Sequence, residues 1–120
     1  MDILLVDDSR TMRLIIQRAI RQAGYRGLAV DEADSAPQAL EKLQSANPKL
    51  ILSDWNMPAI SGLDFLKQIR AANNQVPFGF VTSEASEEMR TLAMTSGASF
   101  FITKPFTPEN FEAALSSILD

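Results

Sequence analysis

The sequence predicts an α/β fold in which a five-stranded parallel sheet carries helices on both faces. Five short apolar runs each precede a longer segment with helical periodicity, and this alternation is typical of parallel sheets. No linker or low-complexity stretch interrupts it. A chain of 120 residues has room for one hydrophobic core, so we expect residues 1–120 to form a single domain with right-handed crossovers.

The first half of the chain contains three of the predicted strands, at residues 3–6, 28–33 and 50–53. The second of these has mixed polarity, which favours a position near a sheet edge. A helix follows the first strand and ends at Gly24, and Ser35 with Gln38 forms a capping box that opens a helix through residue 46. One face of the first helix would consist of Met12, Ile15, Ile16, Ala19, Ile20 and Ala23.

The second half adds two strands, at residues 78–82 and 99–103. Apolar residues at helical spacing predict a third helix between Gly62 and residue 72. Gly79 lies inside the fourth strand, where a glycine weakens the sheet and indicates the close approach of backbone or of a helix.

Cap residues predict where the last two helices begin. Ser86 can cap the fourth helix, and Thr107 with Pro108 begins the fifth, which extends to residue 119. The residues of these helices that would face the core are Met89, Leu92, Ala93, Phe111, Ala114, Leu115, Ile118 and Leu119.

The composition excludes several functional classes. The chain has no cysteine and no histidine, which excludes disulfide frameworks, zinc sites of the usual ligand types, thiol nucleophiles and a Ser-His-Asp triad. A net charge of −4 argues against direct binding of nucleic acid. No apolar run approaches the roughly 18 residues of a membrane span, and the first residues lack the basic start of a signal peptide. We therefore expect a cytoplasmic protein with no membrane insertion.

Polar side chains follow the predicted strands where their carboxyl ends would meet. Asp7 and Asp8 follow the first strand, Asp54 the third, Thr82 ends the fourth, and Lys104 follows the fifth. Ligands bind at this edge of a parallel sheet. Three carboxylates repel one another, and a divalent cation together with the lysine would neutralise them. Oxygen ligands favour Mg²⁺, which readily shares a phosphate oxygen, so the sequence indicates a phosphoryl site.

Five motifs carry a resemblance to a known family. They are Val6-Asp7-Asp8-Ser9, Ser53-Asp54-Trp55-Asn56-Met57-Pro58, Gly62-Leu63, Val81-Thr82-Ser83-Glu84-Ala85 and Lys104-Pro105-Phe106-Thr107. Over essentially its whole length the chain resembles a response-regulator receiver domain, and it is most similar to the stand-alone chemotaxis receivers. The resemblance implies a doubly wound (βα)5 fold with the flavodoxin-like strand order 2-1-3-4-5, and a single receiver domain over residues 1–120.

The resemblance also implies a metal site. Asp8 and Asp54 would bind Mg²⁺, or Mn²⁺ in its place, together with the main-chain carbonyl of Asn56, and Asp7 would act through a metal-bound water. Asp54 would be the phosphoacceptor and would take its phosphoryl group from a histidine kinase or a histidine phosphotransfer domain. Lys104 would pair with a phosphoryl oxygen, and in the family the peptide bond that follows this lysine, here to Pro105, is usually cis.

The same resemblance implies a switch that changes binding of a downstream protein target. Thr82 would donate its hydroxyl group to the phosphoryl group and move inward, and Phe101 would fill the space that it leaves. Chemotaxis receivers commonly have tyrosine at that position, so the phenylalanine is a departure. Phe100 and Phe101 must face opposite sides of their strand. The output surface would be the fourth helix, the fifth strand and the fifth helix.

Residues beside the site would set the lifetime of the phosphorylated state. Asn56 and Glu84 border the path of attacking water in the family, and Ser83 is small enough to leave the phosphoryl group accessible. Like other receivers, the chain would assist its own phosphorylation and dephosphorylation without being an enzyme toward other substrates.

Charge is distributed unevenly along the chain. Residues 9–30 contain five arginines and no acidic residue, whereas the remainder has a net charge of −9. Receivers meet their phosphodonors largely through the first helix, so Arg10, Arg13, Arg18 and Arg21 would form a docking face for an acidic partner. The alternative is an ordinary solvated face opposite the apolar side of the helix.

Other functions remain open from sequence alone. The chain could be the N-terminal receiver of a larger regulator whose output domain lies outside this sequence. A small phosphatase with an aspartate nucleophile, of the haloacid-dehalogenase type, needs a second aspartate two residues after the first, where this chain has Asn56. A nucleotide-binding domain would need a glycine-rich loop after the first strand, where Asp7-Asp8-Ser9-Arg10 stands instead.

Overall fold

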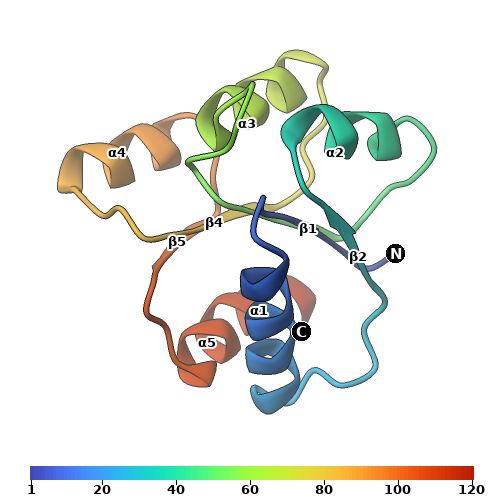
Figure 1. The fold of residues 1–120 in the computed structure, drawn as a ribbon, viewed down its shortest axis with the longest axis vertical. Coiled ribbons are helices and arrows are strands. Elements are labelled where there is room, and N and C mark those ends of the chain that lie inside the picture. The colour runs from blue at the N-terminus through green and yellow to red at the C-terminus, as the bar shows by residue number, and fades with distance from the viewer.

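The computed structural model, which describes residues 1–120, places a five-stranded parallel sheet between two layers of helices (Figure 1). The strand order β2-β1-β3-β4-β5 confirms the predicted fold class and topology. In chain order the elements are β1 (Ile3–Val6), α1 (Arg10–Gln22), β2 (Val30–Ala33), α2 (Ala36–Leu43), β3 (Leu50–Ser53), α3 (Gly62–Ala71), β4 (Phe78–Thr82), α4 (Glu87–Thr95), β5 (Phe100–Thr103) and α5 (Pro108–Leu119).

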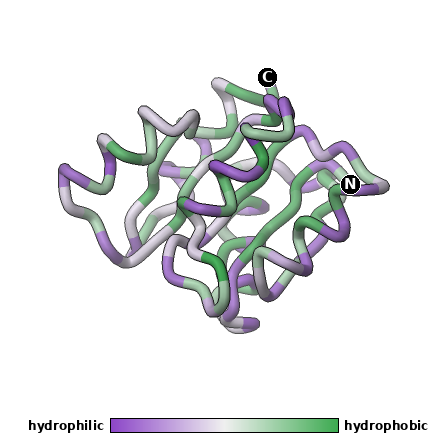
Figure 2. The backbone as a smooth tube through the Cα atoms, turned by 90° about the horizontal axis from the view of Figure 1, so that it is seen from above, coloured by the Kyte–Doolittle hydropathy of each residue, from purple (hydrophilic) through white to green (hydrophobic).

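The core consists of two apolar layers, one on each face of the sheet. Helices α2, α3 and α4 cover one face, and α1 and α5 cover the other (Figure 1). Leu4 and Val6 of β1 belong to the first layer, whereas Ile3 and Leu5 belong to the second, because successive strand residues point to opposite faces. A strand buried on both faces is therefore apolar throughout, and Figure 2 shows β1 as an unbroken hydrophobic run near the N-terminus.

Hydroxyl side chains cap the N-terminus of every helix. Each cap oxygen accepts a hydrogen bond from the backbone N–H group three residues later, and the caps are Ser9, Ser35, Ser61, Ser86 and Thr107. Three of these caps were expected from the sequence, and Ser9 and Ser61 add two more. A cap of this kind stabilises a helix by about 1 kcal/mol, so the strand-to-helix turns that surround the site are firmly defined.

None of the helices combines the length and apolar composition that crossing a bilayer requires.

Three predicted boundaries differ from the structure. The second strand begins at Val30 and not at residue 28, because Ala29 instead pairs with Asp2 ahead of the ladder: its N–H donates to the Asp2 carboxylate and its carbonyl accepts from the Asp2 N–H. The second helix ends at Leu43 and not at residue 46, where its last turn tightens into i-to-i−3 hydrogen bonds. The fifth strand begins at Phe100, one residue later than expected.

Two apolar residues that were predicted to face the core lie at the surface. Ile15 is 43% exposed and Leu92 is 44% exposed. In α1 the buried positions are Ile16, Ala19 and Ile20, and Ile15 is rotated away from them by one helical position. The apolar stripe of each helix is therefore narrower than the apolar residues in its sequence suggest.

Gly79 is explained by a ring that lies directly against it. Phe100 of the neighbouring strand packs over Gly79, and a Cβ atom added there would lie 2.1 Å from two ring carbons. The predicted approach of backbone or a helix is wrong: the close neighbour is the aromatic side chain of Phe100. Phe100 and Phe101 point to opposite faces of the sheet, as expected.

We expect Gly79→Ala to destabilise the fold by about 1–3 kcal/mol, because the added methyl group overlaps the Phe100 ring in a packed core. Urea denaturation followed by circular dichroism would measure the free energy of unfolding. Gly27→Ala is the matched control, since a Cβ atom there has no neighbour within 4 Å. Equal stability of the Gly79→Ala variant and the wild type would contradict the packing described.

Candidate functional site

Three charged side chains from distant parts of the chain meet at the carboxyl edge of the sheet. Strands β1 and β3 are neighbours in register, so Asp7 and Asp54 follow them side by side, and the Asp54 N–H donates to the Val6 carbonyl at 2.9 Å. Lys104 follows β5 and reaches back across β4. Its Nζ lies 3.0 Å from Asp7 Oδ2 and 3.5 Å from Asp54 Oδ2. The sheet topology thus assembles the cluster predicted from the strand ends.

Asp8 completes an acidic group with Asp7 and Asp54. One carboxylate oxygen from each of the three residues lies within 4.8 Å of the others. Asp7 is only 1% exposed, whereas Asp8 is open to solvent. Three carboxylates face one ammonium group, so the pocket keeps a negative charge. An all-oxygen donor set with excess negative charge fits a hard divalent cation such as Mg²⁺.

The two oxygens of Asp54 have different surroundings. Oδ1 accepts a hydrogen bond of 2.7 Å from the backbone N–H of Trp55, whereas Oδ2 faces Lys104. The Ser53 hydroxyl donates to the Asp54 carbonyl oxygen at 2.8 Å. Oδ1 is thereby held in place by its own loop, and Oδ2 points toward the cationic side of the pocket.

Gly62 holds this loop against the start of α3. Its N–H donates to the Trp55 carbonyl oxygen at 2.7 Å, and a Cβ atom at this position would lie 2.1 Å from the Asp54 carbonyl oxygen. Only glycine permits that approach. The sequence motif contained Gly62, but nothing in the local pattern indicated that its role is to position Asp54. Asn56 follows Trp55 in the same loop and is exposed.

Thr82 and Phe101 lie on the same face of the sheet. Thr82 is fully buried, and its hydroxyl oxygen is 3.5 Å from the Glu84 N–H, which is a long hydrogen bond. Phe101 pairs with Phe80 across the strands and packs near Trp55, with ring centroids 6.0 and 6.3 Å apart. Aromatic rings are therefore packed together from Trp55, the residue after Asp54, to Phe101 on β5. Ser83 and Glu84 are both exposed beside the site.

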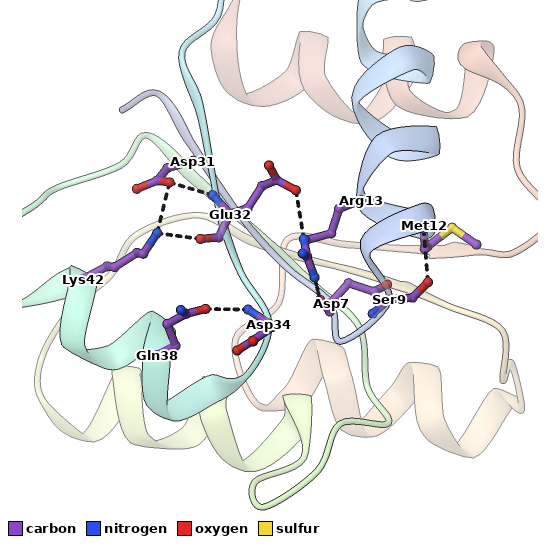
Figure 3. A network of polar contacts seen from close by, with 9 residues as sticks. All are labelled: Asp7, Ser9, Met12, Arg13, Asp31, Glu32, Asp34, Gln38 and Lys42. Atoms are coloured by element: carbon purple, nitrogen blue, oxygen red, sulfur yellow. Dashed lines mark hydrogen bonds and ion pairs between the residues drawn. The ribbon is translucent and has the colours of Figure 1, made fainter.

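Arg13 has a different place from the one predicted for a docking face. Its side chain is 13% exposed; Nη1 donates to the Asp7 carbonyl oxygen at 2.6 Å and Nε pairs with Glu32 Oε1 at 2.8 Å (Figure 3). It fastens the loop of Asp7 to the edge strand β2 and is not available as a surface charge. Sequence alone missed this role because the contact joins residues 19 positions apart.

The edge strand is itself held by a second ion pair. Lys42 of α2 donates to Asp31 Oδ1 at 3.0 Å and to the Glu32 carbonyl oxygen (Figure 3). The hydrogen bond from Lys42 holds the pKa of the Asp31 carboxyl below its usual range. Arg13 therefore ties the loop of Asp7 to a strand that Lys42 also holds, while Lys104 pairs with the Asp7 carboxylate itself. The peptide bond between Lys104 and Pro105 is cis, as the resemblance implied.

The remaining residues of the predicted docking face are at the surface. Arg10, Arg18 and Arg21 are exposed. Leu14, which is 55% exposed, lies on the same stripe of α1, because the four positions are spaced by three or four residues. The result is a basic stripe with an apolar centre on the outside of the helix.

Comparisons with known proteins give a consistent result. The family model described as response regulator receiver domain matches residues 3–116. The chemotaxis protein CheY1 of Helicobacter pylori strain J99 is 38% identical, with 99% of this chain and 97% of that protein covered. The chemotaxis protein CheY of Pseudomonas aeruginosa is 36% identical, with 100% of this chain and 97% of that protein covered. A high-resolution structure of the chemotaxis response regulator CheY4 of Vibrio cholerae matches with a TM-score of 0.83 and 34% sequence identity, with 98% of this chain and 97% of that one covered.

We expect Asp54→Asn to stabilise the metal-free protein by about 1 kcal/mol, because it removes one of three mutually repelling carboxylates. Thermal unfolding in the presence of a chelator would measure this change. Excess Mg²⁺ should then raise the melting temperature of the wild type and have a smaller effect on the variant. Glu41→Gln, on the exposed side of α2, is the matched control. A variant that is less stable than the wild type in chelator would contradict the charge balance described here.

Proposed function

Since the chain belongs to the response regulator receiver domain family, we propose that Asp54 is its phosphoacceptor. The chain is a receiver of the CheY type, a phosphoacceptor signalling switch. The observation that carries the assignment is the asymmetry of the Asp54 carboxylate, with Oδ1 held by the Trp55 N–H and Oδ2 facing Lys104. Residues 1–120 would act as one receiver unit.

In the proposed reaction Oδ2 of Asp54 attacks the phosphorus atom of a phosphohistidine. The new P–O bond forms as the P–N bond breaks, and the imidazole of the donor leaves and takes a proton from solvent. Lys104 Nζ lies 3.5 Å from Oδ2, so it would pair with a phosphoryl oxygen as the negatively charged phosphoryl group moves onto Asp54. The chain would thus assist its own phosphorylation in two ways: it orients the Asp54 carboxylate, and it places the Lys104 ammonium group beside the transferring phosphoryl group.

Four groups of this chain would hold a divalent cation. Asp8 and Asp54 would bind it directly, together with the main-chain carbonyl of Asn56. Asp7 would act through water, which agrees with its burial and with its existing partners, the Ser9 N–H and Lys104. When bound, Mg²⁺ or Mn²⁺ would supply positive charge that offsets the oxygens of the transferring phosphoryl group.

The lifetime of the phosphorylated state would depend on three exposed neighbours of the site. Asn56, Ser83 and Glu84 are at the surface beside Asp54 and Thr82, where attacking water must pass. Ser83 is small and leaves this side open. We propose that these residues tune hydrolysis, so that the chain also assists its own dephosphorylation.

Thr82 and Phe101 would convert phosphorylation into a change in partner binding. The buried Thr82 hydroxyl has only a long hydrogen bond in this structure, so it is free to donate to a phosphoryl oxygen. Phe101 lies on the same side of the sheet and borders the surface formed by α4, β5 and α5. A downstream protein target would bind that surface. The shift in affinity equals the difference in contact energy that one phosphoryl group provides between the two states.

The phosphodonor would dock on the basic stripe of α1. Arg10, Arg18 and Arg21 surround the exposed Leu14, which combines long-range attraction with a small apolar contact. The proposed donor is therefore a histidine kinase or histidine phosphotransfer domain with an acidic surface around its phosphohistidine.

The first test of this function is phosphorylation by acetyl phosphate. With Mg²⁺ present, intact mass spectrometry should show one added phosphoryl group, and the fluorescence of Trp55, the only tryptophan, should change. Asp54→Asn should show neither effect. No adduct on the wild type, or an adduct that persists in the variant, would contradict the assignment of Asp54.

The docking proposal is tested by Arg10→Glu/Arg18→Glu/Arg21→Glu. Charge reversal should slow transfer from a phosphorylated histidine phosphotransfer domain by roughly tenfold or more, because it removes electrostatic steering. Phosphorylation by acetyl phosphate should not change, since a small donor does not use this surface. Rapid-quench measurement of phosphotransfer would give both rates, and equal slowing of the two reactions would overturn the docking role.

A further inference from the structure

Arg13 is a largely buried cation that takes part in none of the steps proposed at Asp54. Its side chain is only 13% exposed. Figure 3 shows it between the loop of Asp7 and the edge strand β2: Nη1 donates to the Asp7 carbonyl oxygen at 2.6 Å, and Nε donates to Glu32 Oε1 at 2.8 Å. Withdrawing a charge from water is costly unless hydrogen bonds compensate it, so these two contacts hold the guanidinium group in one place.

The carbonyl oxygen that Arg13 holds belongs to the peptide unit that joins Asp7 to Asp8. A peptide unit is planar and rigid, so a hydrogen bond to its oxygen restrains the direction in which both neighbouring residues leave the plane. The Asp7 carboxylate has two further partners, the Ser9 N–H and Lys104 Nζ. Asp8 is open to solvent. The orientation of this peptide plane, and not packing, therefore determines where the Asp8 carboxylate can lie.

The other end of the bridge is itself anchored. Glu32 pairs with Leu5 in the ladder between β1 and β2, and its carbonyl oxygen accepts a hydrogen bond from Lys42 (Figure 3). Arginine suits this bridge because its guanidinium group is a rigid, planar fork with separate donors at Nε and Nη1. A lysine would offer one ammonium group on a flexible chain, and that group could not make both contacts in this geometry.

The charge of Arg13 and its position act on a bound metal ion in opposite directions. One carboxylate oxygen each from Asp7, Asp8 and Asp54 lies within 4.8 Å of the others, and a divalent cation would bind among them. A positive charge beside that pocket repels such a cation, so by charge alone the pocket would bind metal more tightly without Arg13. If Arg13 acts by holding the peptide plane, its loss weakens metal binding instead. The sign of the effect separates the two.

We propose that Arg13, anchored by Glu32, is a positioning residue for the divalent cation. It holds the peptide between Asp7 and Asp8 in the orientation in which their carboxylates face Asp54. The inference rests on the proposed function, because it concerns the metal that phosphorylation of Asp54 would use.

The test is calorimetric titration of the full chain with Mg²⁺. Arg13→Gln should weaken binding by roughly tenfold, although it removes a positive charge. Arg13→Lys keeps the charge and should not restore the affinity, because it cannot make both contacts. Arg13→Gln/Glu32→Gln leaves the net charge unchanged. It should bind Mg²⁺ about as weakly as Arg13→Gln does, because the bridge is already lost in the single variant.

Two matched controls each remove one positive charge, as Arg13→Gln does. Lys42→Gln takes away the other support of the edge strand without touching the loop of Asp7, so it should lower stability and leave the affinity for Mg²⁺ nearly unchanged. Arg18→Gln removes an exposed charge from α1 and should leave both nearly unchanged. Circular dichroism would confirm that the variants are folded, and Arg13→Lys carries the test if Arg13→Gln does not fold.

Phosphorylation by acetyl phosphate provides a second readout. In Arg13→Gln the Mg²⁺ concentration that gives half the maximal rate should rise by the same factor as the dissociation constant. The rate at saturating Mg²⁺ should change much less, because Arg13 does not contact the phosphoryl group. A purely structural role would instead reduce the amount of active protein at every Mg²⁺ concentration.

Unchanged or tighter Mg²⁺ binding by Arg13→Gln would overturn the inference. Equal weakening by Lys42→Gln would also overturn it, since Arg13 would then only support the edge strand. The wild type separates the two levels. If it binds Mg²⁺ and accepts the phosphoryl group while the Arg13 variants bind metal equally well, only this inference is refuted. If it does neither, the proposed function is refuted.

Discussion

The ion pair between Lys104 and Asp7 is the contact on which the carboxyl edge of this sheet depends. Asp7 is buried to 1% exposure beside two further carboxylates, and burial of an unpaired charge costs several kcal/mol. The lysine that compensates it comes from the other end of the chain and can reach it only if β1, β3, β4 and β5 lie in register. The fold and the site are therefore specified together: strand order brings the ammonium group to the carboxylates, and the carboxylates require it.

Like charges placed within 4.8 Å need a rigid frame, and two contacts supply it. Arg13 donates to the Asp7 carbonyl oxygen and anchors that loop to Glu32 on the edge strand. Gly62 lets the start of α3 lie against the Asp54 peptide, at a distance that no side chain would allow. These two residues approach only backbone atoms of Asp7 and Asp54, so they fix the position of each aspartate without occupying an oxygen of its carboxylate.

Much of this could be predicted from the sequence, because the features concerned are local. Strand and helix types follow from the periodicity of apolar residues, and the site follows from the polar residues at strand ends. What could not be predicted depends on distant contacts. The exposure of Ile15 depends on how α1 is rotated against the sheet, the internal role of Arg13 depends on Glu32 of another strand, and Gly79 is required by the ring of Phe100. A single sequence does not contain these pairings, because the partners are separated by many residues and become neighbours only after folding.

Helix α1 carries two kinds of arginine with opposite orientations. Arg10, Arg18 and Arg21 are exposed around Leu14, whereas Arg13 is turned inward against the Asp7 carbonyl and Glu32. The outer stripe is therefore basic although the chain as a whole has a net charge of −4. Under the proposed docking role, this local charge would attract an acidic phosphodonor before any side chain is in contact. Because Arg13 already holds the loop of Asp7 in place, docking on the outer stripe would not have to rearrange the site that receives the phosphoryl group.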